Sequence, residues 1–166
     1  MRLSQDWERG WLLTLLLVGL TGCSLKSTDC NIEEPDPKPR SGNAGCLISR
    51  DGEILLIRHQ PSGKIGLPGG TARSGESAQC TAYRETLEET GLAVSVGKFV
   101  TQMDTGFLVY ACRTEGGQYP IPVPAGARWE VQEIFWADPD QLGTETWRFP
   151  TQLDEIRRFM RDDGAI

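Results

Sequence analysis

The sequence has no surplus of basic residues. Its 166 residues include 17 lysines and arginines against 23 aspartates and glutamates, so the formal net charge is −6. A protein that binds a nucleic-acid backbone through its overall charge needs an excess of basic residues, because lysine and arginine supply most of the affinity for phosphates. No nucleic-acid partner is therefore expected. The acidic balance instead suits a protein that meets phosphates through a divalent metal ion.

Long apolar runs are also missing. The stretch from Trp11 to Leu20 is nearly free of polarity but has only ten residues, whereas a bilayer-spanning helix needs about 20. It has the length of a signal-peptide core, and the Leu-Thr-Gly-Cys that ends at Cys23 resembles the lipobox of bacterial lipoproteins. We therefore expect residues 1–22 to be a lipoprotein signal peptide and Cys23 to carry lipid. The protein would then lie at the bacterial cell envelope, on the periplasmic face of a membrane. The alternative is an ordinary buried apolar segment with an incidental cysteine.

Histidine is scarce, with one residue, whereas the sequence has five cysteines. After Cys23 the remaining cysteines are Cys30, Cys46, Cys80 and Cys112. An even number in an exported domain suggests disulfides, so we expect at least one bridge, while the sequence does not choose among the three full connectivities. The alternative is buried free thiols, which behave as small hydrophobes. The single histidine, His59, is interpreted as a residue at the rim of a site and not as a catalyst.

The rest of the chain divides into a tether and one domain. Three prolines alternate with charges from Pro35 to Pro39, which predicts an extended, partly polyproline-like tether over residues 23–42. This tether would hold a domain of residues 43–166 off a membrane. Apolar patterning and turn residues predict strands over 44–49, 54–57, 92–100, 107–112 and 129–137, a long loop over 114–126, and a helix over 151–160. With the central helix, this order predicts an α/β fold in which helices pack on a mixed sheet.

The central helix carries three glutamates on one face. Glu85, Glu88 and Glu89 lie together at about 100° per residue, beside small side chains that would let a ligand approach closely. Like charges at this spacing repel, which indicates that a cation sits against them. Mg²⁺ takes oxygen ligands and shares its shell with substrate phosphates. The alternative is a solvated acidic face, which is common on surface helices.

This helix also belongs to a longer pattern with fixed spacing. The residues that carry the pattern are Gly70, Glu76, Arg84, Glu85, Glu88, Glu89 and Gly91. They resemble the signature of the Nudix hydrolases, with Thr86 at a position that is usually aliphatic. GCLISRDGEILLIRH resembles the first hairpin of the family, and VQEIFWADPDQL resembles its late strand and short helix. The resemblance covers roughly residues 43–162. It implies an α/β/α sandwich with a mixed sheet between helices, and hydrolysis of a diphosphate linked to another moiety.

The resemblance also assigns roles by position. Glu85, Glu88 and Glu89 would be the ligands of Mg²⁺, or of Mn²⁺ in its place, and the carbonyl of Gly69 would complete the shell. Arg84 would orient Glu85 through a charge-assisted hydrogen bond, and Glu76 in the first helical turn is expected to be structural. The general base in the family is either a glutamate of the signature or one on a later loop. The later candidates are Glu130 and Glu133, each of which could instead be an exposed strand residue.

The sequence therefore predicts a magnesium-dependent hydrolase of small diphosphates. The substrate would be a nucleoside diphosphate derivative or a related envelope diphosphate, such as a nucleotide sugar, NAD, ADP-ribose or a polyprenyl diphosphate. One alternative is a non-catalytic binding module of the cell envelope that keeps the Nudix fold, although the intact Arg84 and its neighbouring glutamates argue against it. Another is an adhesive envelope protein in which the acidic helix is only a solvated face.

Overall fold

The computed structural model describes residues 30–114, 116 and 119–162, and the expected signal peptide and Cys23 lie outside them. The elements before the central helix are β1 (Ala44–Leu47), β2 (Ser49–Arg50), β3 (Glu53–His59), β4 (Ile65–Gly66) and β5 (Gly69–Gly70). After them come α1 (Ala78–Thr90), β6 (Val94–Gln102), β7 (Leu108–Thr114), β8 (Val131–Ala137) and α2 (Pro150–Asp162). Short 3₁₀ turns are η1 (Ala125–Ala127), η2 (Pro139–Gln141) and η3 (Thr144–Thr146).

The strands form two sheets. The first has the order β5-β1-β7-β6 and is mixed, because β1 runs parallel to β7 while the other pairs are antiparallel. The second places β3 between β4 and β8, with β2 paired to the start of β3. The single strand expected over 44–49 is therefore two strands in different sheets. The chain leaves the first sheet at Ile48 and enters the second at Ser49.

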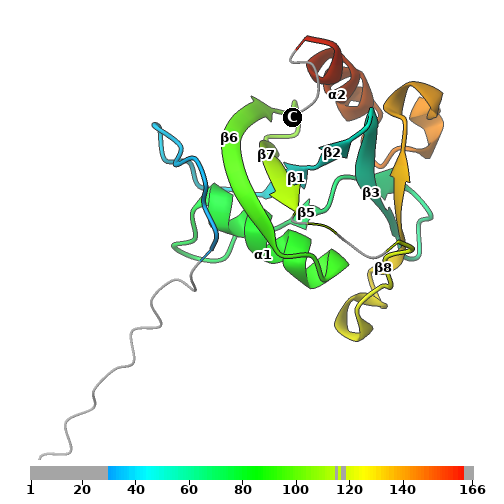
Figure 1. The fold of residues 1–166 in the computed structure, drawn as a ribbon, viewed down its shortest axis with the longest axis horizontal. Coiled ribbons are helices and arrows are strands. Elements are labelled where there is room, and N and C mark those ends of the chain that lie inside the picture. The colour runs from blue at the N-terminus through cyan, green and yellow to red at the C-terminus, as the bar shows by residue number, and fades with distance from the viewer. Residues whose placement is uncertain (1–29, 115, 117–118, 163–166) are drawn as a thin grey trace, which may run out of the picture.

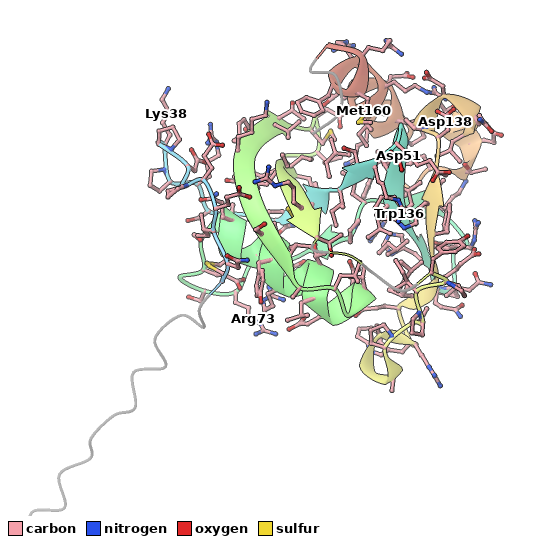
Figure 2. The ribbon with its side chains drawn as sticks, viewed as in Figure 1. Lys38, Asp51, Arg73, Trp136, Asp138 and Met160 are labelled. Atoms are coloured by element: carbon pink, nitrogen blue, oxygen red, sulfur yellow. A yellow bond between two sulfur atoms is a disulfide. The ribbon has the colours of Figure 1, made fainter. Side chains whose placement is uncertain are left out.

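Helices α1 and α2 lie on opposite sides of these strands (Figure 1). Buried side chains alternate along the strands between two apolar cores: Leu55 and Ile57 join the core under α1, and Ile54 and Leu56 join the core under α2. A strand buried on both faces needs a continuous apolar run, which explains Ile54-Leu55-Leu56-Ile57. The side chains between the layers are drawn in Figure 2. The α/β/α sandwich with a mixed sheet between helices is confirmed.

Helix α1 is capped at both ends by its own sequence. Ser77 Oγ accepts a hydrogen bond from the backbone N–H of Cys80 at 3.3 Å, and Gly91 adopts a left-handed φ of 72°. The predicted end of the helix at Gly91 is thus confirmed. Ala78 and Ala82 are fully buried against the first sheet. The expectation that these small residues leave room for a ligand was wrong, because they let the helix approach the sheet.

Helix α2 has the apolar spacing that the sequence predicts. Leu153 and Ile156 are buried in the second core, with Met160 packed beside them. Within the described residues, no helix combines the length and the apolar character needed to cross a membrane.

The expected tether differs from the structure over residues 30–40, which pack on the domain. Ile32 forms a parallel bridge to Val96 of β6, and the backbone N–H of Asp36 donates to Gln79 of α1 at 3.0 Å. Alternating prolines and charges suggested an extended, solvated segment. The burial of Asp36 shows that this part has tertiary partners instead.

Two disulfides confirm the expectation of at least one bridge. Cys30 is bonded to Cys80, which ties the N-terminal segment to α1. Cys46 is bonded to Cys112, which links β1 to β7 inside the first core. The connectivity left open by the sequence is thus decided by which cysteines the fold brings together.

Candidate active site

One cavity gathers side chains from α1, β5 and the approaches to β8 and α2. Its volume is about 750 Å³, within the usual range for small-molecule sites. Carboxylates line one part of it, namely Glu85, Glu89 and Glu130, and basic or aromatic groups line another, namely His59, Lys64, Arg148 and Phe149. A site of this composition can hold a cation and an anion side by side.

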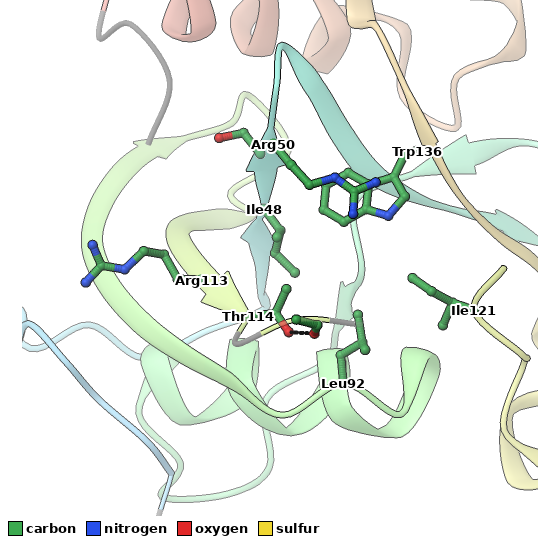
Figure 3. Close-up of a pocket in the computed structure, with 9 residues that line it drawn as sticks. Ile48, Arg50, Leu92, Arg113, Thr114, Ile121 and Trp136 are labelled. Atoms are coloured by element: carbon green, nitrogen blue, oxygen red, sulfur yellow. Dashed lines mark hydrogen bonds between the residues drawn. The ribbon is translucent and has the colours of Figure 1, made fainter. Parts of the chain in front are cut away.

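A second cavity, of about 220 Å³, lies beside the ends of β2 and β7 (Figure 3). Ile48, Leu92 and Ile121 give it apolar walls, and the Arg50 guanidinium lies 4.2 Å from the ring centroid of Trp136. No carboxylate is among its lining residues. The larger cavity is therefore the candidate active site.

Glu89 is the most buried carboxylate of the larger cavity. Its residue is 5% exposed, and Oε2 accepts a hydrogen bond from the backbone N–H of Gly69 at 2.7 Å. Burial raises the pKa of Glu89 to about 8, and the nearby charges of Glu85 and Glu130 add to this shift. A positive charge placed here would stabilise the ionised carboxylate.

Arg84 connects Glu76, just before α1, to Glu85 within the helix. Its Nε and Nη2 donate to the two carboxylate oxygens of Glu76, both at 2.8 Å, and its Nη1 donates to Glu85 Oε1 at 2.8 Å. The hydrogen bonds from Arg84 lower the pKa of Glu76 to about 2, and the same pair raises the pKa of Arg84. These bonds hold Glu85 against Arg84 and Arg84 against Glu76. Glu76 precedes the N-cap Ser77, so the expectation that it lies in the first helical turn was wrong.

The two glycines of β5 allow backbone to approach the carboxylates. A Cβ at Gly70 would lie 2.6 Å from the Glu85 carboxylate. Gly69 has a φ of +153°, and a Cβ there would lie 2.6 Å from the carbonyl oxygen of Ala44. Any side chain at either position would push β5 away from α1 or β1.

Glu88 is not brought into the cavity. Its side chain is 47% exposed and pairs with Arg73 at 2.9 Å and Arg84 at 3.1 Å. Of the three expected carboxylate ligands, the structure thus places Glu85 and Glu89 together and turns Glu88 toward solvent. Glu88 follows Arg84 by four residues, about one helical turn, and is not among the residues that line the cavity.

The two later glutamates have different surroundings. Glu130 lines the cavity, and burial raises its pKa, with help from the charges of Glu85 and Glu88. Glu133 lies on β8 and pairs with Arg58 of β3 at 3.1 Å, with about half of its side chain exposed. Of these two glutamates, only Glu130 can therefore reach a ligand in this cavity without rearrangement.

The donor set fits a divalent cation bound jointly with a substrate. In the part of the chain that the structure describes, no group of three acidic, histidine or cysteine side chains is arranged as a closed metal cage. Mg²⁺ does not require one, since it commonly takes one or two carboxylates plus phosphate oxygens and water. Glu85 and Glu89 provide such a pair, in which Glu85 is bonded to Arg84 while burial raises the pKa of Glu89.

Of the basic and aromatic side of the cavity, only His59 was placed at the rim of a site from the sequence, and the residues missed were Lys64, Arg148 and Phe149. Arg148 is fixed there because its backbone N–H donates to the Ile65 carbonyl at 2.8 Å and the preceding Trp147 is buried. The Arg148 charge and, above all, burial lower the pKa of His59 to about 4, so this imidazole is neutral at pH 7. The adjacent Trp147 and Arg148 were the available signal in the sequence. Ile65, which bonds to the Arg148 backbone, is too distant in sequence to be recognised as its partner.

Comparisons with known proteins agree with this geometry. The model of the NUDIX domain matches residues 39–160. A MutT-like protein of Streptomyces ambofaciens is 30% identical over 127 residues, which cover 74% of this chain and 76% of that protein. A solved ADP-ribose pyrophosphatase from Streptococcus suis has a TM-score of 0.61 at 20% identity, covering 74% of this chain and 91% of that one. A MutT protein from Methanosarcina mazei has a TM-score of 0.55 at 29% identity, covering 81% and 99%.

The family match includes the whole of α1, both glycines of β5 and Glu130. The matched region thus contains the residues that form the carboxylate side of the cavity. The chain therefore belongs to the Nudix family and is an enzyme of the pyrophosphohydrolase type.

Proposed function

We propose that this enzyme cleaves the diphosphate linkage of a nucleoside diphosphate derivative or of a related envelope diphosphate, with Mg²⁺ as cofactor. The observation that carries the proposal is the meeting of three carboxylates, one of them buried, and Arg148 in one cavity. A metal-bridged diphosphate presents both a cation for the carboxylates and an anion for the arginine. The ADP-ribose pyrophosphatase among the similar structures supports a nucleoside diphosphate derivative as the first substrate to test.

The proposed metal ligands are Glu85 and Glu89, with the carbonyl of Gly69 beside them. Glu88 can join them only by leaving its ion pairs with Arg73 and Arg84. When bound, Mg²⁺ screens the phosphate charge and favours ionisation of the attacking water. Arg84 keeps the Glu85 carboxylate in place throughout, through the bond at 2.8 Å.

Glu130 is the proposed general base. A water molecule attacks phosphorus, its proton passes to the Glu130 carboxylate, and the bond between phosphorus and the bridging oxygen breaks. Arg148 and Lys64 are placed to bind the charge on the phosphates as the bridging oxygen leaves. His59 stays neutral and offers a ring nitrogen as a hydrogen-bonding group at the same wall.

The enzyme is proposed to be anchored by lipid on Cys23, with the mature chain starting there. The support is the apolar run that ends in Leu-Thr-Gly-Cys. Changing Cys23 to serine should leave an uncleaved, unlipidated precursor, because the acceptor sulfur is gone. Cell fractionation with intact-mass analysis tests this: an identical mass and location for wild type and variant would overturn the anchor.

The hydrolase proposal is tested with the full chain purified in detergent. Phosphate-containing products are measured from ADP-ribose, a nucleotide sugar, NAD and a polyprenyl diphosphate, with Mg²⁺, with Mn²⁺, and with EDTA. We expect metal-dependent turnover of at least one substrate and none with EDTA. Tight binding of these compounds without any turnover would instead support the non-catalytic binding module.

A further inference from the structure

Residues 30–40, which we call the strap, are held on the domain by buried polar contacts. Asp36 is the centre of the strap: its carboxylate accepts a hydrogen bond from the Tyr110 hydroxyl at 3.1 Å and pairs with Arg40. Burial would raise the pKa of Asp36, but these bonds and the one from the Lys38 N–H hold it below its ordinary value. Gln79 of α1 adds a hydrogen bond from Nε2 to the Glu34 carbonyl at 2.8 Å.

The strap is also covalently joined to the helix that carries the candidate metal ligands. The Cys30–Cys80 disulfide brings the two Cα atoms to 5.3 Å. Cys80 lies in the first turn of α1, nine residues before Glu89. At a rise of about 1.5 Å per residue, Glu85 lies about 8 Å and Glu89 about 14 Å further along the helix axis.

Chain length then limits how far the site can be from a lipid on Cys23. Seven peptide steps separate Cys23 from Cys30, and we call this segment the leash. Because a chain extends by at most about 3.5 Å per residue, the leash spans at most about 25 Å. A free tether over residues 23–42 would reach about 70 Å by the same rule. The strap therefore removes nearly two-thirds of the reach expected from the sequence.

We propose that the strap turns the tether into a short leash that keeps the N-terminal end of α1 at the membrane surface, so that the enzyme acts preferentially on diphosphates carried by that membrane. This inference rests on the proposed hydrolase activity and on the lipid at Cys23. The partner surface is the lipid bilayer that holds the anchor, and the substrate class is a lipid-linked diphosphate. Water-soluble diphosphates reach the same cavity without any benefit from the leash.

The test lengthens the leash without altering a described residue. Twenty glycine and serine residues are inserted between Ser27 and Thr28 in the full, lipidated chain, which is reconstituted in phosphatidylethanolamine–phosphatidylglycerol vesicles. Turnover of a polyprenyl diphosphate in the vesicles is compared with turnover of ADP-ribose in the water. Because effective concentration falls as roughly the −3/2 power of linker length, the ratio of the two rates should drop about sevenfold.

A second readout measures the distance between the domain and the membrane surface. After signal-peptide removal, its tryptophans are Trp129, Trp136 and Trp147, and energy transfer from them to a dansyl-labelled lipid should fall in the longer variant. Replacing both Cys30 and Cys80 by serine should also lower the transfer. The matched control, serine at both Cys46 and Cys112, removes a disulfide of the core and should not lower it.

An unchanged rate ratio or unchanged energy transfer in the insertion variant would overturn the leash. Its failure is separable from that of the hydrolase, because ADP-ribose turnover reports the chemistry alone. If the wild-type protein turned over none of the substrates, the proposed hydrolase activity itself would be rejected. Wild-type protein that does not stay with the vesicles would reject the anchor and the leash together.

Discussion

Single carboxylates in this molecule differ because their surroundings differ. Glu89 is buried with one backbone donor, Glu76 is held by a guanidinium, and Glu133 is solvated beside Arg58. The pKa of Glu89 is accordingly raised, and that of Glu76 is lowered. The same residue type therefore offers a candidate ligand, a structural ion pair and an exposed control.

Glu89 should destabilise the metal-free protein as pH rises. Its pKa is 4.5 in the unfolded chain and about 8 in the folded one, so the folding free energy becomes less favourable between these values. Changing Glu89 to glutamine should then raise the free energy of unfolding at pH 8 by on the order of 1–3 kcal/mol and lower turnover about 10²- to 10⁴-fold. Denaturant unfolding in EDTA checks the first effect, which should disappear near pH 4. An equal gain at both pH values would contradict burial as the cause.

Glu130 should matter for turnover and Glu133 should not. A Glu130→Gln change removes the group that accepts the proton, so kcat should fall about 10²- to 10⁴-fold with little change in KM. Glu133→Gln is the matched control, since it alters the same residue type in the same segment, outside the cavity. If the two variants have equal rates, the base is a glutamate of α1.

Arg148 should act on substrate binding. Changing Arg148 to glutamine removes a charged donor from the cavity, and a lost charge-assisted hydrogen bond of about 1.5–3 kcal/mol corresponds to a rise in KM of about 10- to 100-fold. Arg158→Gln, on the exposed side of α2, makes the same charge change elsewhere. Steady-state kinetics with the best substrate decide it: equal KM values for both variants would remove Arg148 from the site.

Among the elements, α1 joins structure and chemistry most directly. Its buried side holds two alanines against the first sheet, and its Arg84 pairs with Glu76 just before the helix, with both side chains 14% exposed. Glu85 and Glu89 follow on the same helix. The stability of the start of α1 therefore affects the position of Glu85 and Glu89, the proposed metal ligands.

The Glu76–Arg84 pair should be lost in acid. The pKa of Glu76 is lower in the folded state, about 2, than the ordinary 4.5, so its contribution is present above pH 4.5 and is lost as pH falls toward 2. Wild type should therefore exceed Glu76→Gln in the free energy of unfolding by on the order of 2 kcal/mol at pH 6 and by little near pH 2. Urea unfolding over this range provides the measurement. A pH-independent difference would show that the pair stabilises by shape alone.

At the scale of the whole molecule, two disulfides hold together parts that are far apart in sequence. One closes 50 residues between the strap and α1, and the other closes 66 residues between β1 and β7. Both limit the unfolded chain, and for loops of this length each bond stabilises by about 2–5 kcal/mol. Disulfides persist in oxidising compartments, so these two bonds support the proposed export.

Oxidised protein should therefore expose no reactive thiol among these cysteines. Alkylation of the denatured chain without reductant should leave Cys30, Cys46, Cys80 and Cys112 unmodified, and reductant should make all of them reactive. Peptide mass mapping of the unreduced protein should find Cys30 with Cys80 and Cys46 with Cys112. Any modified member of this set without reductant would contradict the pairing.

The sequence by itself determined the local and periodic features. The cap at Gly91, the apolar spacing of α2 and the spacing of Arg84, Glu85 and Glu89 all depend on neighbours within a few residues. Tertiary structure alone decided three other matters: the outward turn of Glu88, the choice of Glu130 over Glu133 at the cavity, and the place of Arg148. The first depends on the ion pairs of Glu88 with Arg73 and Arg84. The other two depend on the register of β8 with β3 and on the bond from Arg148 to Ile65. The strap follows the same rule, because Asp36 looks like a solvated charge until Tyr110 and Gln79 are brought against it.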